Sequence, residues 1–231
     1  MKNLTFLFVL VLSTLQLSAQ DPVKKIHMGV SINPQMNLST FEDAPYVEKE
    51  NSFCLGVSGD IYFDVTPRLQ IRSGLGIQYL TLNHRDHSFQ WPHQGQSGEW
   101  HPDQSFVGYN TRYYFAGVPI YVKVKTQAKP NHFYVTGGVT PHALISYDGE
   151  IVTNEAGHVT TFDTPKGVYE PVSFFTTVGV GIGYERVIGK RKIMVEPNFQ
   201  YSTGLFFKDS TVSSRANGHV GVAGIRMGIV I

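Results

Sequence analysis

The chain has 231 residues, a formal net charge of +1 and a single cysteine. The charge balance argues against nucleic acid as a partner, and one cysteine excludes an internal disulfide framework. Beyond the N-terminal segment, no run approaches the roughly 18 consecutive apolar residues that a transmembrane helix needs. With 23 glycines and many aromatic residues, the composition is typical of one all-β domain.

The N-terminal segment has the pattern of a secretory signal peptide. Lys2 provides a positive start, residues 4–17 are apolar, and Ser18 and Ala19 are small residues suited to a cleavage site. We expect residues 1–19 to be removed and residues 20–231 to form the folded domain. A buried N-terminal strand or helix is the alternative interpretation of the same segment.

Eight segments then alternate between apolar and polar residues with a period of two. This period predicts strands, and no segment shows the 3.6-residue period of an amphipathic helix. In chain order the segments cover residues 25–33, 52–65, 69–82, 113–125, 132–147, 172–187, 192–202 and 218–231. The fourth and fifth are joined by a Lys/Pro/Asn turn, and each is about as long as the 9–11 residues that a strand needs to cross a bilayer.

The connections between these segments alternate strictly in length. Long connections cover residues 34–51, 83–110, 148–171 and 203–217, and short ones cover residues 66–68, 126–131 and 188–191. An antiparallel up-and-down transmembrane β-barrel has short periplasmic turns and long outer loops, and its even strand number places both termini in the periplasm. A Greek-key sandwich does not sort its loops in this way. The pattern therefore predicts an eight-stranded barrel in an outer membrane.

The two faces of the segments differ in a way that indicates which one points outwards. The polar face is rich in glycine, and an eight-stranded barrel has an interior only just wide enough for side chains. The apolar face ends in aromatic residues, as do the lipid-facing bands of outer-membrane barrels. These rings belong to Phe53, Phe63, Tyr79, Phe133, Phe174, Tyr184 and Tyr201. We expect the apolar face to meet lipid.

Several stretches carry a family resemblance. They are the signal ending LQLSAQ and the strand sequences LQIRSGLGIQY, FAGVPIYVKVK, FYVTGGV, TTVGVGIGYE and VEPNFQYSTGL. Together they resemble the PorT-type outer-membrane β-barrel proteins of Bacteroidota. The resemblance implies an integral protein of a Gram-negative outer membrane. Its partners would be outer-membrane lipid, with other cell-envelope proteins or surface glycans as further candidates.

The inward face carries charges of both signs near the periplasmic ends of the strands. Four acids and four bases are expected there: Asp60, Asp64, Glu185 and Glu196 with Arg72, Lys123, Lys125 and Arg226. The turn at residues 66–68 places Arg72 opposite Tyr62, and Glu196 and Arg226 are expected at similar height on neighbouring strands. Charges in a narrow lumen must be paired. We therefore expect a closed, salt-bridged lumen, with Cys54 as a small buried side chain.

The third connection is rich in histidine and tryptophan. Imidazole and carboxylate groups bind zinc or copper, which makes the histidines weak candidates for a metal site, although their spacing fits no defined motif. Trp91 and Trp100 are candidates for a contact with a glycan or a protein. The histidines are His84, His87, His93 and His101. We expect neither a metal nor a cofactor.

Two other functional classes compete with a structural or surface-interaction barrel. A lipid-modifying barrel enzyme would need a base beside a hydroxyl, such as His142 with Ser146, or His219 with Ser202 or Ser214, and the chain has no G-x-S-x-G elbow. A soluble lipocalin-like carrier would turn the apolar face inwards around a ligand. The sequence favours the barrel without catalysis over both.

Overall fold

In the computed structural model, the described part of the chain consists almost entirely of β-strands and the turns between them. It covers residues 26–38, 40–42, 47–49, 52–86, 106–155, 158–163, 172–204 and 217–231. The expected signal peptide lies outside these ranges. The strands are β1 (Ile26–Asn37), β2 (Thr40–Glu42), β3 (Val47–Lys49), β4 (Phe53–Asp64), β5 (Leu69–Asp86), β6 (Phe106–Gly117), β7 (Ile120–Lys125), β8 (His132–Glu155), β9 (His158–Asp163), β10 (Phe174–Ile188), β11 (Arg191–Ser202), β12 (Asn217–His219) and β13 (Gly221–Val230).

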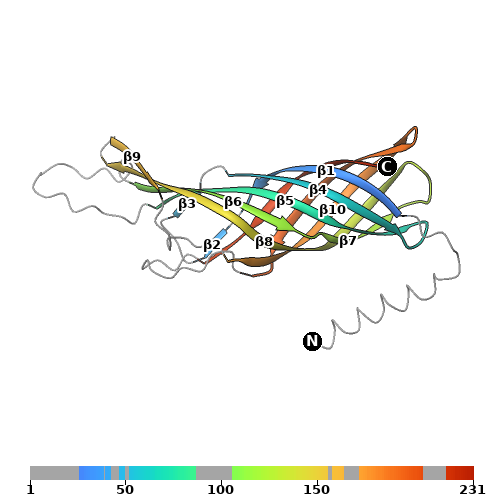
Figure 1. The fold of residues 1–231 in the computed structure, drawn as a ribbon, viewed down its shortest axis with the longest axis horizontal. Coiled ribbons are helices and arrows are strands. Elements are labelled where there is room, and N and C mark those ends of the chain that lie inside the picture. The colour runs from blue at the N-terminus through green and yellow to red at the C-terminus, as the bar shows by residue number, and fades with distance from the viewer. Residues whose placement is uncertain are drawn as a thin grey trace, which may run out of the picture.

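The strands close into an antiparallel ring of eight positions (Figure 1). The ring runs β1, β4, β5, β6 with β7, β8, β10, β11 and β13, and β13 pairs back onto β1. β6 and β7 occupy one position, because both pair with β5 on one side and β8 on the other. The predicted eight-stranded, up-and-down β-barrel is therefore confirmed. Within the described residues no helix is long and apolar enough to cross a membrane.

The short connections lie together at one end of the barrel, which we call the turn end; the opposite end is the loop end. The turn end includes residues 65–68, 126–131 and 189–190 and the C-terminus, at the right of Figure 1. Gly189 has a φ of 61°, a left-handed conformation that glycine adopts without a side-chain penalty, so it suits the two-residue turn between β10 and β11.

Several strands extend further towards the loop end than the sequence pattern predicts. β5 reaches Asp86 and β8 reaches Glu155, so the expected loops 83–110 and 148–171 both contain strand residues. The polar residues at these positions do not end the pairing. Arg112 of β6 stands opposite Asp148 of β8, with Arg112 Nη1 3.8 Å from Asp148 Oδ2, so a cross-strand charge pair continues the ladder.

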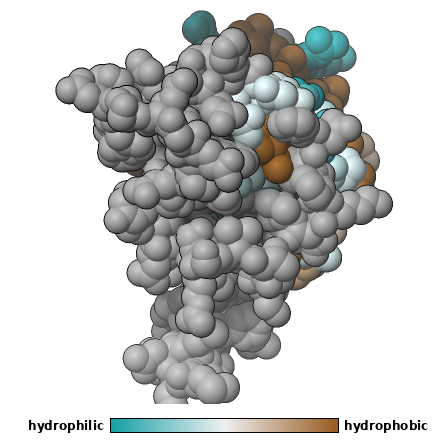
Figure 2. Space-filling model, turned by 90° about the vertical axis from the view of Figure 1, so that its left-hand side faces the viewer, coloured by the Kyte–Doolittle hydropathy of each residue, from teal (hydrophilic) through white to brown (hydrophobic). Residues whose placement is uncertain are grey.

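The outward face of the barrel is apolar. Large hydrophobic side chains along every strand of the ring are exposed, and hydrophobic residues are among the described ones visible at the surface in Figure 2. In β10, for example, exposed and buried residues alternate strictly from Thr177 to Arg186. The outward orientation of the apolar face agrees with the expectation from its aromatic ends.

Tyrosines fill much of the interior, and glycines leave space for them. A Cβ atom at Gly183 would collide with the ring of Tyr134, and one at Gly179 would collide with the hydroxyl of Tyr121. Both tyrosines are buried. The glycine-rich inner face therefore reflects the close approach of neighbouring strands and large side chains in a narrow lumen.

The loop-end half of the interior differs from the expectation of a polar lumen. It is filled by a cluster of buried, mostly apolar side chains: Cys54, Leu80, Leu82, Tyr113, Phe115, Phe175, Val220 and Val222. Leu80 and Leu82 follow Gln78 on the inward face of β5, so the polar inner face becomes apolar towards the loop end. Cys54 is fully buried, and its thiol donates to Gln35 Oε1 at 3.3 Å.

Candidate functional site

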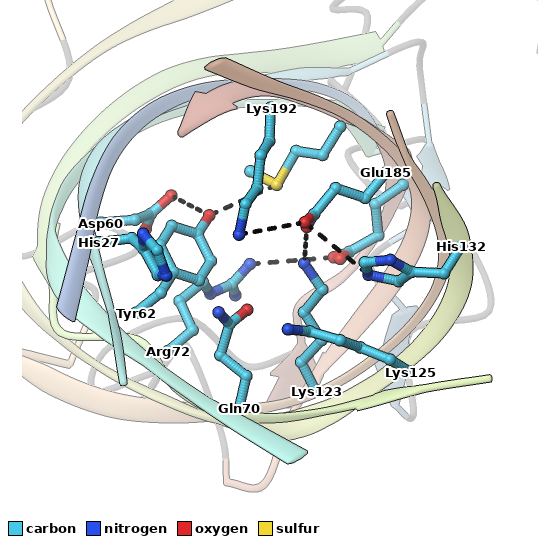
Figure 3. Close-up of polar contacts among 12 residues, drawn as sticks. His27, Asp60, Tyr62, Gln70, Arg72, Lys123, Lys125, His132, Glu185 and Lys192 are labelled. Atoms are coloured by element: carbon cyan, nitrogen blue, oxygen red, sulfur yellow. Dashed lines mark hydrogen bonds and ion pairs between the residues drawn. The ribbon is translucent and has the colours of Figure 1, made fainter. Parts of the chain in front are cut away.

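The eight predicted lumenal charges all lie in the turn-end part of the interior, and most of them contact one another there. Figure 3 labels five of them, Asp60, Arg72, Lys123, Lys125 and Glu185. The eight charges are brought together from different sides of the ring, because inward-facing residues of β4, β5, β7, β10, β11 and β13 meet in a narrow space. Three of the four carboxylates have basic partners, and the fourth is held by hydroxyl groups.

Glu185 of β10 is the centre of the first group. It accepts a hydrogen bond from Nζ of Lys123, and Lys192 Nζ lies 3.7 Å from its Oε1. His132 Nε2 is 3.8 Å from the same oxygen. Glu185 and Lys123 are almost completely buried. A buried carboxylate surrounded by cationic groups has the partners that its desolvation requires.

Glu196 of β11 is shared by two arginines. Arg226 stands directly opposite it on β13 and donates from Nη2 to Glu196 Oε2 at 2.7 Å. Arg72 reaches across the lumen from β5, with Nη1 3.9 Å from Glu196 Oε1. The structure thus places Glu196 and Arg226 at the same height and adds a second basic partner from the opposite side of the barrel.

Asp64 forms a third group near the turn end. Its Oδ1 accepts from Gln70 Nε2 at 2.8 Å and from Lys125 Nζ at 3.3 Å. Its Oδ2 lies 3.0 Å from His27 Nε2. These side chains are more accessible than the rest of the network, since about a fifth of the Asp64 and His27 side chains is exposed.

Asp60 is paired with hydroxyl groups and not with a base. Ser31 donates to its Oδ2 at 2.9 Å, Ser58 donates to Oδ1 at 3.1 Å, and the Tyr62 hydroxyl is 3.4 Å from Oδ2. Tyr62 does stand opposite Arg72, as the turn predicts. The ion pair of Arg72 nevertheless crosses the lumen to Glu196 and does not join its strand neighbours Asp60 and Asp64.

Aromatic rings line the same space. The guanidinium of Arg72 lies 4.4 Å from the centre of the Tyr121 ring, and Lys123 Nζ lies 4.1 Å from the centre of the Tyr134 ring. Both distances are within the range of cation–π attraction. The rings therefore stabilise the buried cations.

Three members of this network were missed by the sequence analysis. Lys192 and His27 are the second residues of β11 and β1, and His132 is the first residue of β8, so the alternation is short there and gives a weak signal. With Lys192 the described lumen holds five Lys or Arg side chains against four carboxylates, and the expected cancellation of charges fails by one.

The structure separates one of the base–hydroxyl pairs considered for catalysis and buries another. His142 points inwards and lies 3.1 Å from Thr177 Oγ1, whereas Ser146 follows a β-bulge and is exposed. Ser202 Oγ does lie 3.4 Å from His219 Nδ1, but Ser202 is completely buried. Ser214 lies outside the described residues. A hydroxyl without access to substrate cannot act as a nucleophile.

Most of the histidine- and tryptophan-rich connection lies outside the described residues. This applies to His87, Trp91, His93, Trp100 and His101, whose expected roles stay predictions. His84 belongs to β5, where it pairs with Tyr109 and Lys49. Within the described ranges, no group of three or more His, Cys, Asp or Glu side chains is placed to hold a metal ion.

Fold and site together define an antiparallel eight-stranded β-barrel with an apolar outer surface and a charged, filled interior.

No family model and no curated protein matches the chain. Solved structures with a similar fold include three proteins of low sequence identity. Neisserial surface protein A is 9% identical with a TM-score of 0.37, covering 89% of this chain and 95% of that one. Ail of Yersinia pestis is 9% identical with a TM-score of 0.38, covering 89% and 98%. The outer membrane protease OmpT of Escherichia coli is 10% identical with a TM-score of 0.41, covering 88% and 96%.

Proposed function

We propose that the protein is an integral outer-membrane β-barrel of a Gram-negative bacterium, with a closed lumen and a structural or surface-interaction role. Its turn end and both termini face the periplasm. Outer-membrane lipid surrounds the strands, and the loops, with Trp91 and Trp100, contact other cell-envelope proteins or surface glycans. The resemblance of its strand sequences to PorT-type proteins supports an origin in Bacteroidota. No catalysis is part of this proposal.

The spacing of outward aromatic rings carries the proposal. On β4, Phe53 and Phe63 are both outward and ten residues apart, and on β10 the same interval separates Phe174 and Tyr184. Ten residues of strand at about 3.3 Å each, tilted by about 45°, cross about 23 Å. This height matches the apolar band of roughly 25 Å between the aromatic girdles of outer-membrane barrels.

Between these rings the outer surface is mostly apolar. On β10 the intervening outward residues are Thr176, Val178, Val180 and Ile182, and the last three are exposed. A soluble protein rarely exposes apolar patches above a few hundred Å², whereas a lipid-facing surface requires them. The same observation argues against a lipocalin-like carrier, whose apolar side chains would line the interior.

The filled interior supports a closed lumen. Its loop-end half is packed with apolar side chains and its turn-end half with paired charges and tyrosines. An open channel requires a wider barrel than eight strands provide. We therefore expect no steady conductance when the purified protein is inserted into planar bilayers.

Cell fractionation tests the proposal. The protein should sediment with the outer membrane and stay there after washes with carbonate or urea, which remove peripheral proteins. A known soluble periplasmic protein and a known outer-membrane barrel serve as controls in the same gradient. Recovery in the soluble periplasmic fraction would refute the membrane assignment and favour a carrier.

A further inference from the structure

A cavity of about 70 Å³ lies in the lumen between the charged and the apolar halves. Its lining includes Arg72 and Arg226 from the charge network and Gln78 from beside the apolar cluster. A cavity needs roughly 10–15 Å³ to hold one water molecule, so this one accommodates a ligand of several non-hydrogen atoms. Its lining combines apolar groups with amide and guanidinium groups, so it differs from the dry cavities of wholly apolar cores.

Both arginines that line the cavity have hydrogen-bonding capacity left over. Arg72 is 4% exposed and Arg226 is 8% exposed. Arg72 Nε and Nη1 and Arg226 Nε are buried and have no hydrogen-bond partner among the described residues. An unsatisfied buried donor is destabilising, and native proteins leave few of them. The missing acceptors therefore point to a group that the described residues do not supply.

The charges around the cavity favour a negative group. Arg72 and Arg226 share the single carboxylate of Glu196, and the lumen holds one cation more than it holds carboxylates. Asp60 also lines the cavity, but its carboxylate accepts hydrogen bonds from Ser31 and Ser58. One added anion offsets the excess of positive charge and provides acceptors for the unpaired guanidinium nitrogens.

We infer that the cavity binds one small free oxyanion, such as phosphate, sulfate or a short carboxylate, between Arg72 and Arg226. Planar guanidinium groups recognise the oxygens of such ions through paired, charge-assisted hydrogen bonds. The oxyanion links β5, β11 and β13 across the lumen through these arginines and Glu196, and so stabilises the closed barrel. This site goes beyond the proposed structural role and does not depend on which membrane the barrel occupies.

Inorganic phosphate is the first probe, added to the refolded full-length barrel in detergent at constant ionic strength with chloride as the replacement ion. Titration calorimetry should give one phosphate per barrel. Because phosphate binds only the folded state, it should raise the folded-to-unfolded ratio about 100-fold at 100 times its dissociation constant, measured by urea unfolding.

Two variants distinguish specific phosphate binding in the cavity from a nonspecific effect of lumenal charge on phosphate affinity. Arg226→Lys keeps the charge but loses the planar donor fork, and should weaken phosphate binding by roughly tenfold or more. Lys192→Gln removes a cation that contacts Glu185 and does not line the cavity, and should change the affinity much less. If Arg226→Lys does not fold, Gln78→Glu places a negative charge in the lining and should abolish binding.

Saturable binding of one phosphate, weakened by Arg226→Lys and retained by Lys192→Gln, supports the site. No saturable binding, or equal effects of these two variants, overturns it. A short-chain phosphatidic acid carries the same phosphate on a glyceride; if it binds more tightly than inorganic phosphate, the ligand is a lipid headgroup and the inference of a free ion is wrong.

Discussion

The ring of Tyr134 occupies the space that a side chain on Gly183 would need, on the neighbouring strand of the barrel wall. The two residues stand opposite each other on β8 and β10. The tyrosine ring in turn lies against the Lys123 ammonium that bonds Glu185. A glycine in the wall thus allows an aromatic ring to cover a buried ion pair.

Gly183→Ala should therefore destabilise the barrel by about 1–3 kcal/mol, because the added methyl group forces Tyr134 away from Lys123. The free energy of unfolding in urea, measured in liposomes, checks this. Gly137→Ala is the matched control, since a Cβ at Gly137 meets no atom within 4 Å. Equal stability of the two variants would show that the packing of Tyr134 against Gly183 does not contribute to the free energy of unfolding.

The two partners of Glu196 make its removal more damaging than the removal of either arginine. Glu196→Leu leaves Arg72 and Arg226 buried without a carboxylate, at a cost of about 3–5 kcal/mol. Arg226→Leu should cost less, because Arg72 remains beside Glu196. The double variant, Glu196→Leu with Arg226→Leu, should recover part of the stability lost in Glu196→Leu. Equilibrium unfolding that gives the reverse order, or a double variant no better than Glu196→Leu, would contradict a shared carboxylate.

The proposed orientation predicts which positions are accessible on intact cells. Cys54 is fully buried and gives no background, so single cysteines can be placed at Asp148 towards the loop end and at Lys129 and Lys190 at the turn end. A membrane-impermeant maleimide should label only Asp148→Cys on intact cells, and all three after the outer membrane is permeabilised. Labelling of Lys129→Cys or Lys190→Cys on intact cells would invert the topology.

Closure of the ring predicts heat-modifiable migration in detergent gels. Because β13 pairs with β1, the sheet has no free edge from which the barrel can unravel at room temperature. Unheated protein should therefore migrate differently from a boiled sample of the same preparation. Identical migration of heated and unheated protein, after refolding in detergent, would contradict a stable closed barrel.

The strand number, the ring and the outward face could be predicted because the two-residue period extends over every membrane-length segment. The loop-end boundaries could not, since strands there continue through polar residues such as Arg112 and Asp148, which pair with each other. The apolar loop-end core could have been predicted from Leu80 and Leu82, which lie on the same inward face of β5 as Gln78.

Contacts between neighbouring strands were easier to predict from sequence than contacts across the lumen. The three-residue turn fixes Tyr62 opposite Arg72, and nearness to the chain end and to a turn brings Glu196 level with Arg226. The pairing of Arg72 with Glu196 depends on the tilt and stagger of the whole barrel, which no local pattern encodes.

A charge on the outer wall tests the lipid-facing assignment most directly. Val180 is 56% exposed between Phe174 and Tyr184, and Ile145 is 57% exposed on the loop-end side of the residue that pairs with Phe174. In liposomes, Val180→Lys should cost about 2–4 kcal/mol of unfolding free energy, and Ile145→Lys about 0–1 kcal/mol, because the penalty falls towards the membrane interface. A cost below about 0.5 kcal/mol for Val180→Lys, as for an ordinary water-exposed position, would contradict the membrane barrel.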